Sequence, residues 1–298
     1  MVDVMCRLYG MSGAPHRVRA TFWLLEAQDS LVAQSRRDPD GTGLGYFDTH
    51  GNPHVDKRPI AAFEDESFAR GAREVYSETF VAHIRYASTG GLTPENTHPF
   101  EQNGRLLAHN GVIEDLGKLE ARLGSYRDLV AGDTDSERFF ALVTKETDEH
   151  GGDVTEGLVA AARWVAGELP LFALNVVLIT CREMWALRYP DTHELYVLPR
   201  SPGGSHDAHL DHRSRARTVR VRSADLGTYP AVVVASEPMD ADPGWRPLSS
   251  GELLHVDHEL HVSSAIVIDQ PPRHPLTLAD LAPKAASSQT AHGAGTAR

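Results

Sequence analysis

The sequence predicts an α+β fold, in which helices gather in the middle of the chain and strands lie on either side. Apolar residues recur at helical spacing between residues 113 and 167, whereas the flanking regions are rich in β-forming residues punctuated by turns. Tight turns between successive strands favour antiparallel sheets covered by helices. With 298 residues, 41% of them hydrophobic, the chain can bury a substantial core in one large domain or two.

In the first part of the chain, residues 17–27 are weakly amphipathic and predict a short helix or loop element. Residues 38–47 run from a turn into a strand, and residues 48–53 predict a hairpin turn. The Gly-x-Gly-x-Gly pattern at 41–45 has no following helix and no Gly-Lys-Ser/Thr, which excludes a dinucleotide or phosphate loop.

Two further strands and three helices are expected in the middle of the chain. Residues 80–88 predict a buried strand, and residues 105–109 predict a second one that Asn110-Gly111 ends in a sharp turn. A helix should run from about 113 to Gly124, and another from 154 to 167. Between them, Thr134-Asp135-Ser136-Glu137 has the Thr-x-x-Glu pattern of a capping box, which predicts a helix with Asp135 at its N-terminus.

The pattern of the remaining residues predicts strands, with hairpin turns at 182–183 and 257–258. The expected strands are 174–181, 184–189, 194–198, 231–236, 252–256 and 260–268. Residues 200–222 are rich in Gly, Ser, His and Arg and predict an exposed, mobile loop. Residues 283–298 lack periodicity and predict a disordered tail.

Composition excludes several classes of function. The net charge of -12 argues against nucleic-acid binding, which depends on clustered Lys and Arg. Two cysteines cannot form a disulfide framework, no Cys-x-x-Cys is present for zinc, and both features fit a reducing cytoplasm. No apolar run approaches the roughly 20 residues of a spanning helix, and no secretory signal is evident, so neither membrane insertion nor export is expected.

Cys6 is the leading candidate for a nucleophile. A thiol needs a base, because the thiolate attacks and free Cys has a pKa of about 8.5. An N-terminal cysteine carries its own base, since an α-amine has a pKa of about 7.7 to 8. This interpretation requires residues 1–5 to be absent from the mature protein; the alternative is an ordinary buried cysteine near a terminus.

Three other stretches suggest a site around this thiol. Arg85 ends a buried strand, where a guanidinium requires a carboxylate partner. Asn110 and Gly111 can direct an amide and an N–H at one point, as in an oxyanion hole, and Asp135 suits a ligand ammonium. Each has a structural alternative: an ion pair, a hairpin turn or a helix-start charge. Together they describe a small zwitterion held at both ends, with its amide carbonyl beside a thiol.

These motifs resemble those of the class II glutamine amidotransferases, the N-terminal nucleophile hydrolases. The resemblance rests on Met5-Cys6-Arg7-Leu8, His83-Ile84-Arg85-Tyr86-Ala87, Asn96-Thr97-His98-Pro99-Phe100, His109-Asn110-Gly111 and Gly132-Asp133-Thr134-Asp135-Ser136-Glu137, in that order. More narrowly, the chain resembles the stand-alone bacterial members, which include the amidohydrolase of ergothioneine biosynthesis. The resemblance implies a four-layer αββα sandwich over residues 6–270.

The resemblance also implies an activity and site roles. Cys6 would attack the γ-amide of glutamine or a γ-glutamyl compound and form a thioester, with release of ammonia from glutamine. Arg85 would hold the α-carboxylate and Asp135 the α-ammonium, while Asn110 and Gly111 stabilise the oxyanion. His98, Ser88 and Thr89 would line the pocket. No cofactor or metal is implied, and ammonia would pass to a separate synthase subunit or be released.

Two rival interpretations remain, and the first comes from another class of enzyme. His206, His209, Asp211 and His212 resemble a metal-hydrolase motif, but the first two histidines are three apart where that motif has them two apart. The stretch also lies in the predicted loop, which does not favour a positioned metal site. The second rival is a catalytically silent glutamine-binding subunit or sensor of the same fold, in which the residues before Cys6 block the chemistry.

Overall fold

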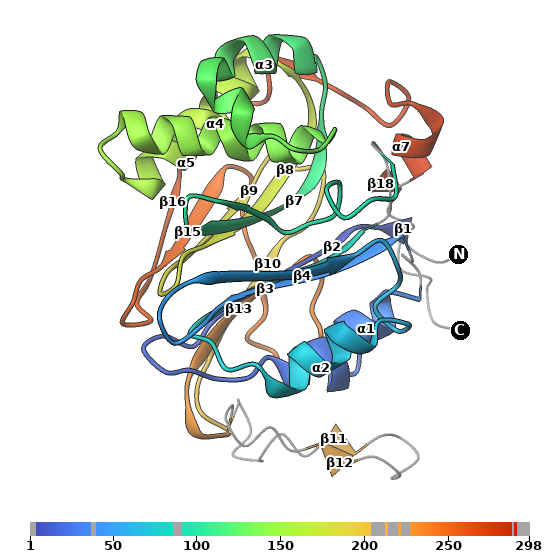
Figure 1. Cartoon of the computed structure of the whole chain (residues 1–298), viewed down its shortest axis with the longest axis vertical. Coiled ribbons are helices and arrows are strands. Elements are labelled where there is room, and N and C mark those ends of the chain that lie inside the picture. The colour runs from blue at the N-terminus through green and yellow to red at the C-terminus, as the bar shows by residue number, and fades with distance from the viewer. Residues whose placement is uncertain are drawn as a thin grey trace.

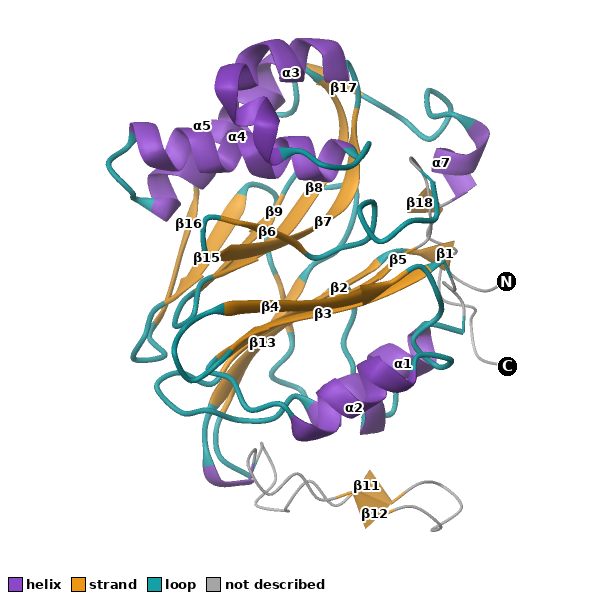
Figure 2. Ribbon diagram, viewed as in Figure 1, coloured by secondary structure: helices purple, strands orange, loops and turns teal. Residues whose placement is uncertain are grey.

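The computed structural model describes residues 4–36, 40–85, 91–203, 212–213, 220–221, 227–287 and 289–290. Two seven-stranded sheets lie face to face, and helices cover the outer side of each (Figures 1 and 2). This is a four-layer αββα sandwich, as the family resemblance implied. No helix among these residues is long and apolar enough to cross a membrane.

The first sheet has the strand order β14-β10-β13-β2-β5-β3-β4. Its strands are β2 (Arg7–Ser12), β3 (Gly41–Phe47), β4 (Pro53–Arg58), β5 (Thr79–Arg85), β10 (Tyr196–Arg200), β13 (Ala231–Ala235) and β14 (Arg246–Pro247). The predicted hairpin at 48–53 joins β3 to β4, and the Asp48 carboxylate accepts hydrogen bonds from the His50 and Asn52 amides in its turn. All neighbouring strands in this sheet are antiparallel.

The second sheet follows the order β16-β15-β9-β8-β7-β6, with β17 pairing beside β8. Its strands are β6 (Phe100–Gln102), β7 (Arg105–Ile113), β8 (Pro170–Ile179), β9 (Met184–Arg188), β15 (Glu252–Val256), β16 (Val262–Ile266) and β17 (His274–Pro275). The turns predicted at 182–183 and 257–258 do connect paired strands, β8 with β9 and β15 with β16.

Strand β7 departs from the sequence prediction at Asn110 and Gly111. Instead of turning sharply, the strand continues to Ile113, with Asn110 opposite Asn175 and Gly111 opposite Leu174 on β8. The glycine is required by close packing, because a Cβ at position 111 would lie 1.9 Å from the carbonyl oxygen of Ala173. Pairing with β8 therefore overrides the turn preference of Asn-Gly.

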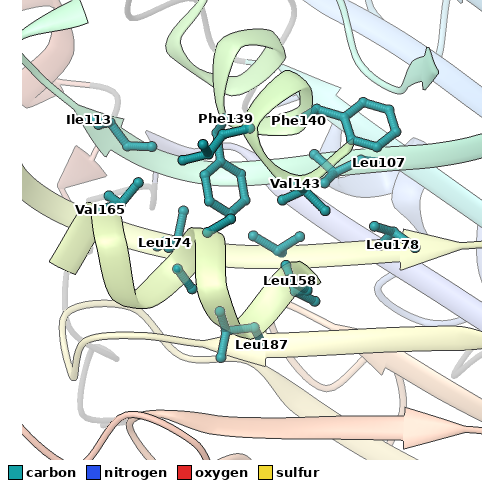
Figure 3. Close-up of a cluster of buried hydrophobic side chains, with 14 of the residues drawn as sticks. Leu107, Ile113, Phe139, Phe140, Val143, Leu158, Val165, Leu174, Leu178 and Leu187 are labelled. Atoms are coloured by element: carbon teal, nitrogen blue, oxygen red, sulfur yellow. The ribbon is translucent and has the colours of Figure 1, made fainter. Parts of the chain in front are cut away.

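Four helices pack on the second sheet: α3 (Leu116–Leu123), the 3-10 helix η2 (Gly124–Leu129), α4 (Asp135–Glu149) and α5 (Val154–Glu168). The Thr134 hydroxyl accepts a hydrogen bond from the Glu137 amide, which confirms the predicted N-cap of α4. Figure 3 shows the apolar cluster between helices and sheet, where Phe139 and Val143 from α4 face Leu174 and Leu178 from β8. Burial of this cluster fixes α4, and hence its N-terminus, against β7 and β8.

On the opposite outer face, three short helices cover the first sheet: the π-helix η1 (Phe22–Glu26), α1 (Leu31–Gln34) and α2 (Glu66–Glu74). Their core includes Trp23 and Phe68, both fully buried against Tyr9 and Phe80. A third core lies between the sheets and includes Leu8, Leu106 and Val177. Successive side chains of β7 point to opposite faces of the sheet. Leu106 and Ala108 therefore face the other sheet, whereas Leu107 faces the helices.

Two short strands and a helix join the ends of the described chain. Strand β1 (Val4–Met5) pairs antiparallel with β18 (Gln289–Thr290), and helix α7 (Pro283–Ser287) precedes β18. Figure 1 shows all three at the same end of the sandwich. The structure thus differs from the disorder predicted after residue 283, because Leu281 and Ala285 pack on Val112 and Phe172. Residues 291–298, and most of the predicted loop at 200–222, lie outside the described residues.

Candidate active site

A small, partly open cavity lies where the two sheets and the N-terminus of α4 meet. Its volume is about 20 Å³, which is room for a single water molecule. The first sheet, the second sheet, helix α4 and the C-terminal segment all contribute to it. Its lining consists of Cys6, His83, Arg85, His98, His109, Asn110, Gly111, Thr134, Asp135, Ser136 and Gln289.

Cys6 stands directly before β2 and is 7% exposed. Its carbonyl oxygen accepts a hydrogen bond of 2.9 Å from the Asn110 side-chain amide, which ties the start of β2 to the facing sheet. The next residues are also fixed: the Arg7 guanidinium pairs with Glu237 at 2.9 Å, and the Leu8 amide donates to the Ser236 hydroxyl. The thiol is therefore carried by a rigid backbone.

Arg85 is the last residue of β5, two positions beyond His83 on the same face of the strand. Its guanidinium donates to the Gly91 carbonyl at 3.0 Å, and the side chain is buried. Burial lowers the pKa of this guanidinium, while Cys6, Asp40 and Asp135 raise it. Since arginine remains protonated in proteins, the cavity contains a fixed positive charge facing the thiol.

Asp135 is the first residue of α4, where the helix dipole favours a negative charge. One carboxylate oxygen accepts from the Ile113 amide at 2.9 Å, and the other accepts from the Ser136 amide at 2.9 Å. The carboxylate thus joins the start of α4 to the end of β7. A carboxylate has about four acceptor positions, so these bonds leave capacity for a ligand cation.

Three buried histidines complete the polar lining. The rings of His83 and His98 lie 4.2 Å apart, and neither ring nitrogen of either residue has a hydrogen-bond partner among the described side-chain contacts. Burial, followed by the charge of Arg85, lowers the pKa of His83 to about 3, and burial lowers that of His98. Both rings are therefore neutral near pH 7, with polar atoms available to a small ligand or water.

His109 is oriented by two contacts on opposite sides of its ring. Nδ1 lies 2.9 Å from the Ser136 hydroxyl, and Nε2 lies 3.3 Å from the carbonyl oxygen of Ala173. A carbonyl can only accept, so we assign the proton to Nε2. The Ser136 hydroxyl has a single proton, for which Nδ1 at 2.9 Å and the Asp135 carboxylate at 3.3 Å are the two acceptors. Burial lowers the pKa of His109 as well, although Asp135 opposes this effect.

The structure brings six of the sequence-predicted site residues to this cavity: Cys6, Arg85, His98, Asn110, Gly111 and Asp135. Ser88 and Thr89, the other two, lie outside the described residues. Sequence reasoning missed His83, His109, Thr134, Ser136 and Gln289 as lining residues. His83 could have been found, because it lies two residues before Arg85 in a strand and residues at that spacing share a face. No local pattern indicated Gln289.

The arrangement combines a thiol, a guanidinium, a carboxylate and amide donors around one small cavity. An Asn side chain has two N–H groups, of which Asn110 uses one on the Cys6 carbonyl, so the second remains for an oxyanion. Among the described residues, no group of three or more His, Cys, Asp or Glu has the arrangement of a metal site. The histidines at 206–212 that resemble a metal motif lie outside the described residues.

Comparison with known sequences gives a consistent result. Residues 5–275 match the family described as class-II glutamine amidotransferases. The gamma-glutamyl-hercynylcysteine sulfoxide hydrolase of Mycolicibacterium smegmatis is 28% identical over 269 residues, covering 87% of this chain and 98% of that protein. A putative glutamine amidotransferase of Escherichia coli is 26% identical, covering 83% and 96% respectively. A glutamine–fructose-6-phosphate aminotransferase of Wigglesworthia glossinidia brevipalpis is 36% identical over 133 residues, only 22% of its length.

Solved structures support the fold. A glutamine aminotransferase class-II domain protein from Silicibacter pomeroyi superimposes with a TM-score of 0.57 at 19% identity, covering 87% of this chain and 98% of that one. The glutamine phosphoribosylpyrophosphate amidotransferase of Bacillus subtilis gives a TM-score of 0.61 at 20% identity, over 89% of this chain and 50% of that one. The sandwich is therefore shared with these proteins.

Proposed function

Since the chain belongs to the class II glutamine amidotransferases, an enzyme family that cleaves amide bonds, we propose that Cys6 is its nucleophile and a γ-glutamyl amide its substrate. The observation that carries the proposal is that Cys6, Arg85, Asn110 and Asp135 line one cavity. These groups match the thiol, carboxylate binder, oxyanion donor and ammonium binder that such a reaction requires. The substrate class comprises glutamine and compounds with an amide on the γ-carboxyl of glutamate.

Substrate recognition uses charge at both ends of the amino-acid group. Arg85 pairs with the α-carboxylate, and its fork of donors favours a planar carboxylate. Asp135 receives the α-ammonium. With both ends held, the γ-carbonyl carbon is presented to the Cys6 sulfur, so that positioning contributes to the rate.

Attack by the Cys6 thiolate gives a tetrahedral intermediate, whose oxyanion receives hydrogen bonds from the second Asn110 N–H and the Gly111 N–H. The C–N bond then breaks, and the amine leaves with a proton while a thioester forms. Water adds to the thioester, which releases the γ-carboxylate and restores the thiol. Loss of one oxyanion donor typically costs about 10²- to 10³-fold in rate.

We assign the base to the α-amine of Cys6 once residues 1–5 are absent. A general base works best with a pKa near the working pH. The buried histidines are poor candidates, because the pKa of His83 is lowered to about 3 and that of His98 is also lowered by burial. An α-amine, with a pKa of about 7.7 to 8, fits the requirement.

We favour a hydrolase that releases its amine over one that passes ammonia to a separate synthase subunit. The relative from Mycolicibacterium smegmatis is named a hydrolase of a γ-glutamyl compound, and the match covers 98% of it. The aminotransferase relative is matched over only 22% of its length. A thiol nucleophile needs a reducing environment, so we expect the protein in the cytoplasm.

The test is glutamate release from glutamine and a panel of γ-glutamyl amides, measured on a chain that begins at Cys6. We expect Cys6→Ala to abolish release, whereas the matched variant Cys181→Ala retains it, because Cys181 does not line the cavity. Asn110→Ala should reduce kcat about 10²- to 10³-fold. Wild-type glutamate release by Cys6→Ala would disprove the proposed mechanism.

A second candidate is a catalytically silent glutamine-binding subunit or sensor. It is favoured by one observation: Val4 and Met5 form a paired strand immediately before Cys6, so the Cys6 nitrogen is in a peptide bond in this chain. Intact-mass measurement of the protein from its native host separates the candidates. A mature chain that begins at Cys6 supports the enzyme, and one that keeps Met1–Met5 and binds glutamine without turnover supports the sensor.

A further inference from the structure

Gln289 is a cavity-lining residue that comes from the far end of the sequence. Its side chain is 2% exposed and lies against the same space as Cys6, Arg85 and Asn110. Its Oε1 atom is 2.7 Å from Nε2 of His193, a buried histidine on the approach to β10. A glutamine side chain ends in a γ-carboxamide, which is the group that the proposed function assigns to the substrate.

This residue cannot act as a substrate itself. Its own α-nitrogen and α-carboxyl are in peptide bonds, so it offers neither the ammonium nor the carboxylate that Asp135 and Arg85 would bind. Its carboxamide oxygen is instead directed to His193. With Gln289 in place, the cavity measures only about 20 Å³, whereas small-molecule pockets occupy roughly 300 to 1,000 Å³. Substrate can enter only if something in the lining moves.

Besides the contact of the Gln289 side chain with His193, the segment that carries this residue has two anchors. Leu281 and Ala285 pack on Val112, Phe172 and Ala173, next to the strand residues Asn110 and Gly111. Beyond this anchor, β18 pairs with β1, with Gln289 opposite Met5 and Thr290 opposite Val4. Among the described residues, β1 is the only strand partner of β18. The second anchor therefore consists of the two residues that precede the nucleophile.

We infer that Gln289 and Thr290 form a latch that closes the cavity over Cys6 for as long as Val4 and Met5 hold them in a two-stranded sheet. The inference rests on the proposed function for the identity of the cavity. Hydrolysis of the Met5–Cys6 bond, in which water gives its hydroxyl to Met5 and a proton to the Cys6 nitrogen, removes β1. One event then frees the α-amine and releases the latch, so that the catalytic base and substrate access appear together.

If the latch exists, the accessibility of Cys6 should depend on which residues are present at both ends of the chain. Four proteins are compared: chains that begin at Met1 or at Cys6, each ending at Thr290 or at Ser287. The chain that ends at residue 290 is the matched control, because it loses residues 291–298 but keeps β18. The Cys6 chains are produced with an initiator methionine that is removed during expression.

The first measurement is alkylation of Cys6 by iodoacetamide, followed by peptide mass mapping with Cys181 as the internal reference. Among the chains that begin at Met1, we expect the one that ends at Ser287 to react at Cys6 about tenfold faster, or more, than the one that ends at Thr290. In chains that begin at Cys6, the two ends should react at equal rates. This comparison within each pair cancels any effect of the free amine on thiol reactivity. Equal rates in the Met1 pair would overturn the latch.

The second measurement keeps the chain length constant. In the full chain, Gln289→Gly removes the carboxamide but leaves the backbone of β18, and it should also speed Cys6 alkylation; Lys284→Ala, an exposed position on α7, is the control and should leave the rate unchanged. Hydrogen exchange at the amides of residues 289–290 should be slower in the Met1 chain than in the Cys6 chain. Equal protection in both chains would contradict a latch held by β1.

Glutamate release from the same proteins separates the two proposals. If the Cys6 chain releases no glutamate but the alkylation pattern holds, the latch is a cover over Cys6 and the proposed function fails. If glutamate is released while alkylation and exchange do not depend on the chain ends, the function stands and the latch is overturned.

Discussion

Strand β7 contributes to two buried regions that differ in chemistry. Toward the helices, Leu107 packs with Phe139 and Leu174 in a cluster of aliphatic and aromatic side chains (Figure 3). At the cavity, His109 and Asn110 of the same strand meet His83, His98 and Arg85. These residues from both regions are at most 5% exposed. One region is apolar and complete within the chain, whereas the other is polar.

The two regions differ in whether their buried polar atoms have hydrogen-bond partners. Side-chain atoms of His83 and His98, and the Oδ1 atom of Asn110, have no hydrogen-bond partner in the described structure. An unpaired buried polar group costs about 1 to 3 kcal/mol, so a cluster of such groups marks a place where partners arrive from outside. The apolar region stabilises the fold. Part of that stability offsets the free-energy cost of keeping polar groups in the cavity unpaired, where a ligand can bind them.

The largest effect that tests this contrast is expected in the apolar region. Phe139→Ala should lower the free energy of unfolding by about 3 to 5 kcal/mol, because it leaves a void beneath α4 that the close-packed neighbours cannot fill. Phe139→Leu is the conservative control and should cost less. Urea unfolding followed by circular dichroism measures both. A loss below about 1 kcal/mol for Phe139→Ala would mean that this cluster does not support the fold as described.

The second test compares two buried arginines on paired strands. Arg85→Gln should lower kcat/KM for the best γ-glutamyl substrate by about 100-fold or more, since it removes the charge proposed to bind the α-carboxylate. Arg7→Gln should lower the free energy of unfolding more than Arg85→Gln does, because it breaks the Arg7–Glu237 ion pair. Unchanged kcat/KM in Arg85→Gln would remove this residue from the site.

The smallest effect concerns pH. His83 titrates at a pKa of about 3 in the folded chain against 6.5 for the free side chain, so the unfolded chain binds more protons between these values. Stability should therefore fall as the pH falls from 6.5 toward 3, with about 1.4 kcal/mol per pH unit from each such proton. Urea unfolding of His83→Asn at pH 7 and pH 5 should show a weaker dependence than the wild type. An identical dependence would show that this ring is not held neutral by burial.

Most of the predicted elements follow from local patterns, and the structure confirms them. The hairpin at 48–53, the cap at Thr134 and the helix that begins at Val154 each depend on residues close together in the sequence. The prediction failed at Asn110 and Gly111, where pairing with β8 continues the strand. The tail at 283–287 also differs from the expectation, since its helix depends on contacts with Val112 and Phe172 that no local pattern records.

By itself, the sequence identified the residues proposed to carry the chemistry, because a thiol, a guanidinium, an amide and a carboxylate are properties of side chains and their motifs lie in short stretches. Tertiary structure decided what surrounds them. Residue 111 is glycine because a Cβ there would collide with the Ala173 carbonyl on the neighbouring strand. Gln289 comes from the other end of the chain to line the same cavity as Cys6. Such contacts depend on how distant segments pack, which spacing along the chain does not encode.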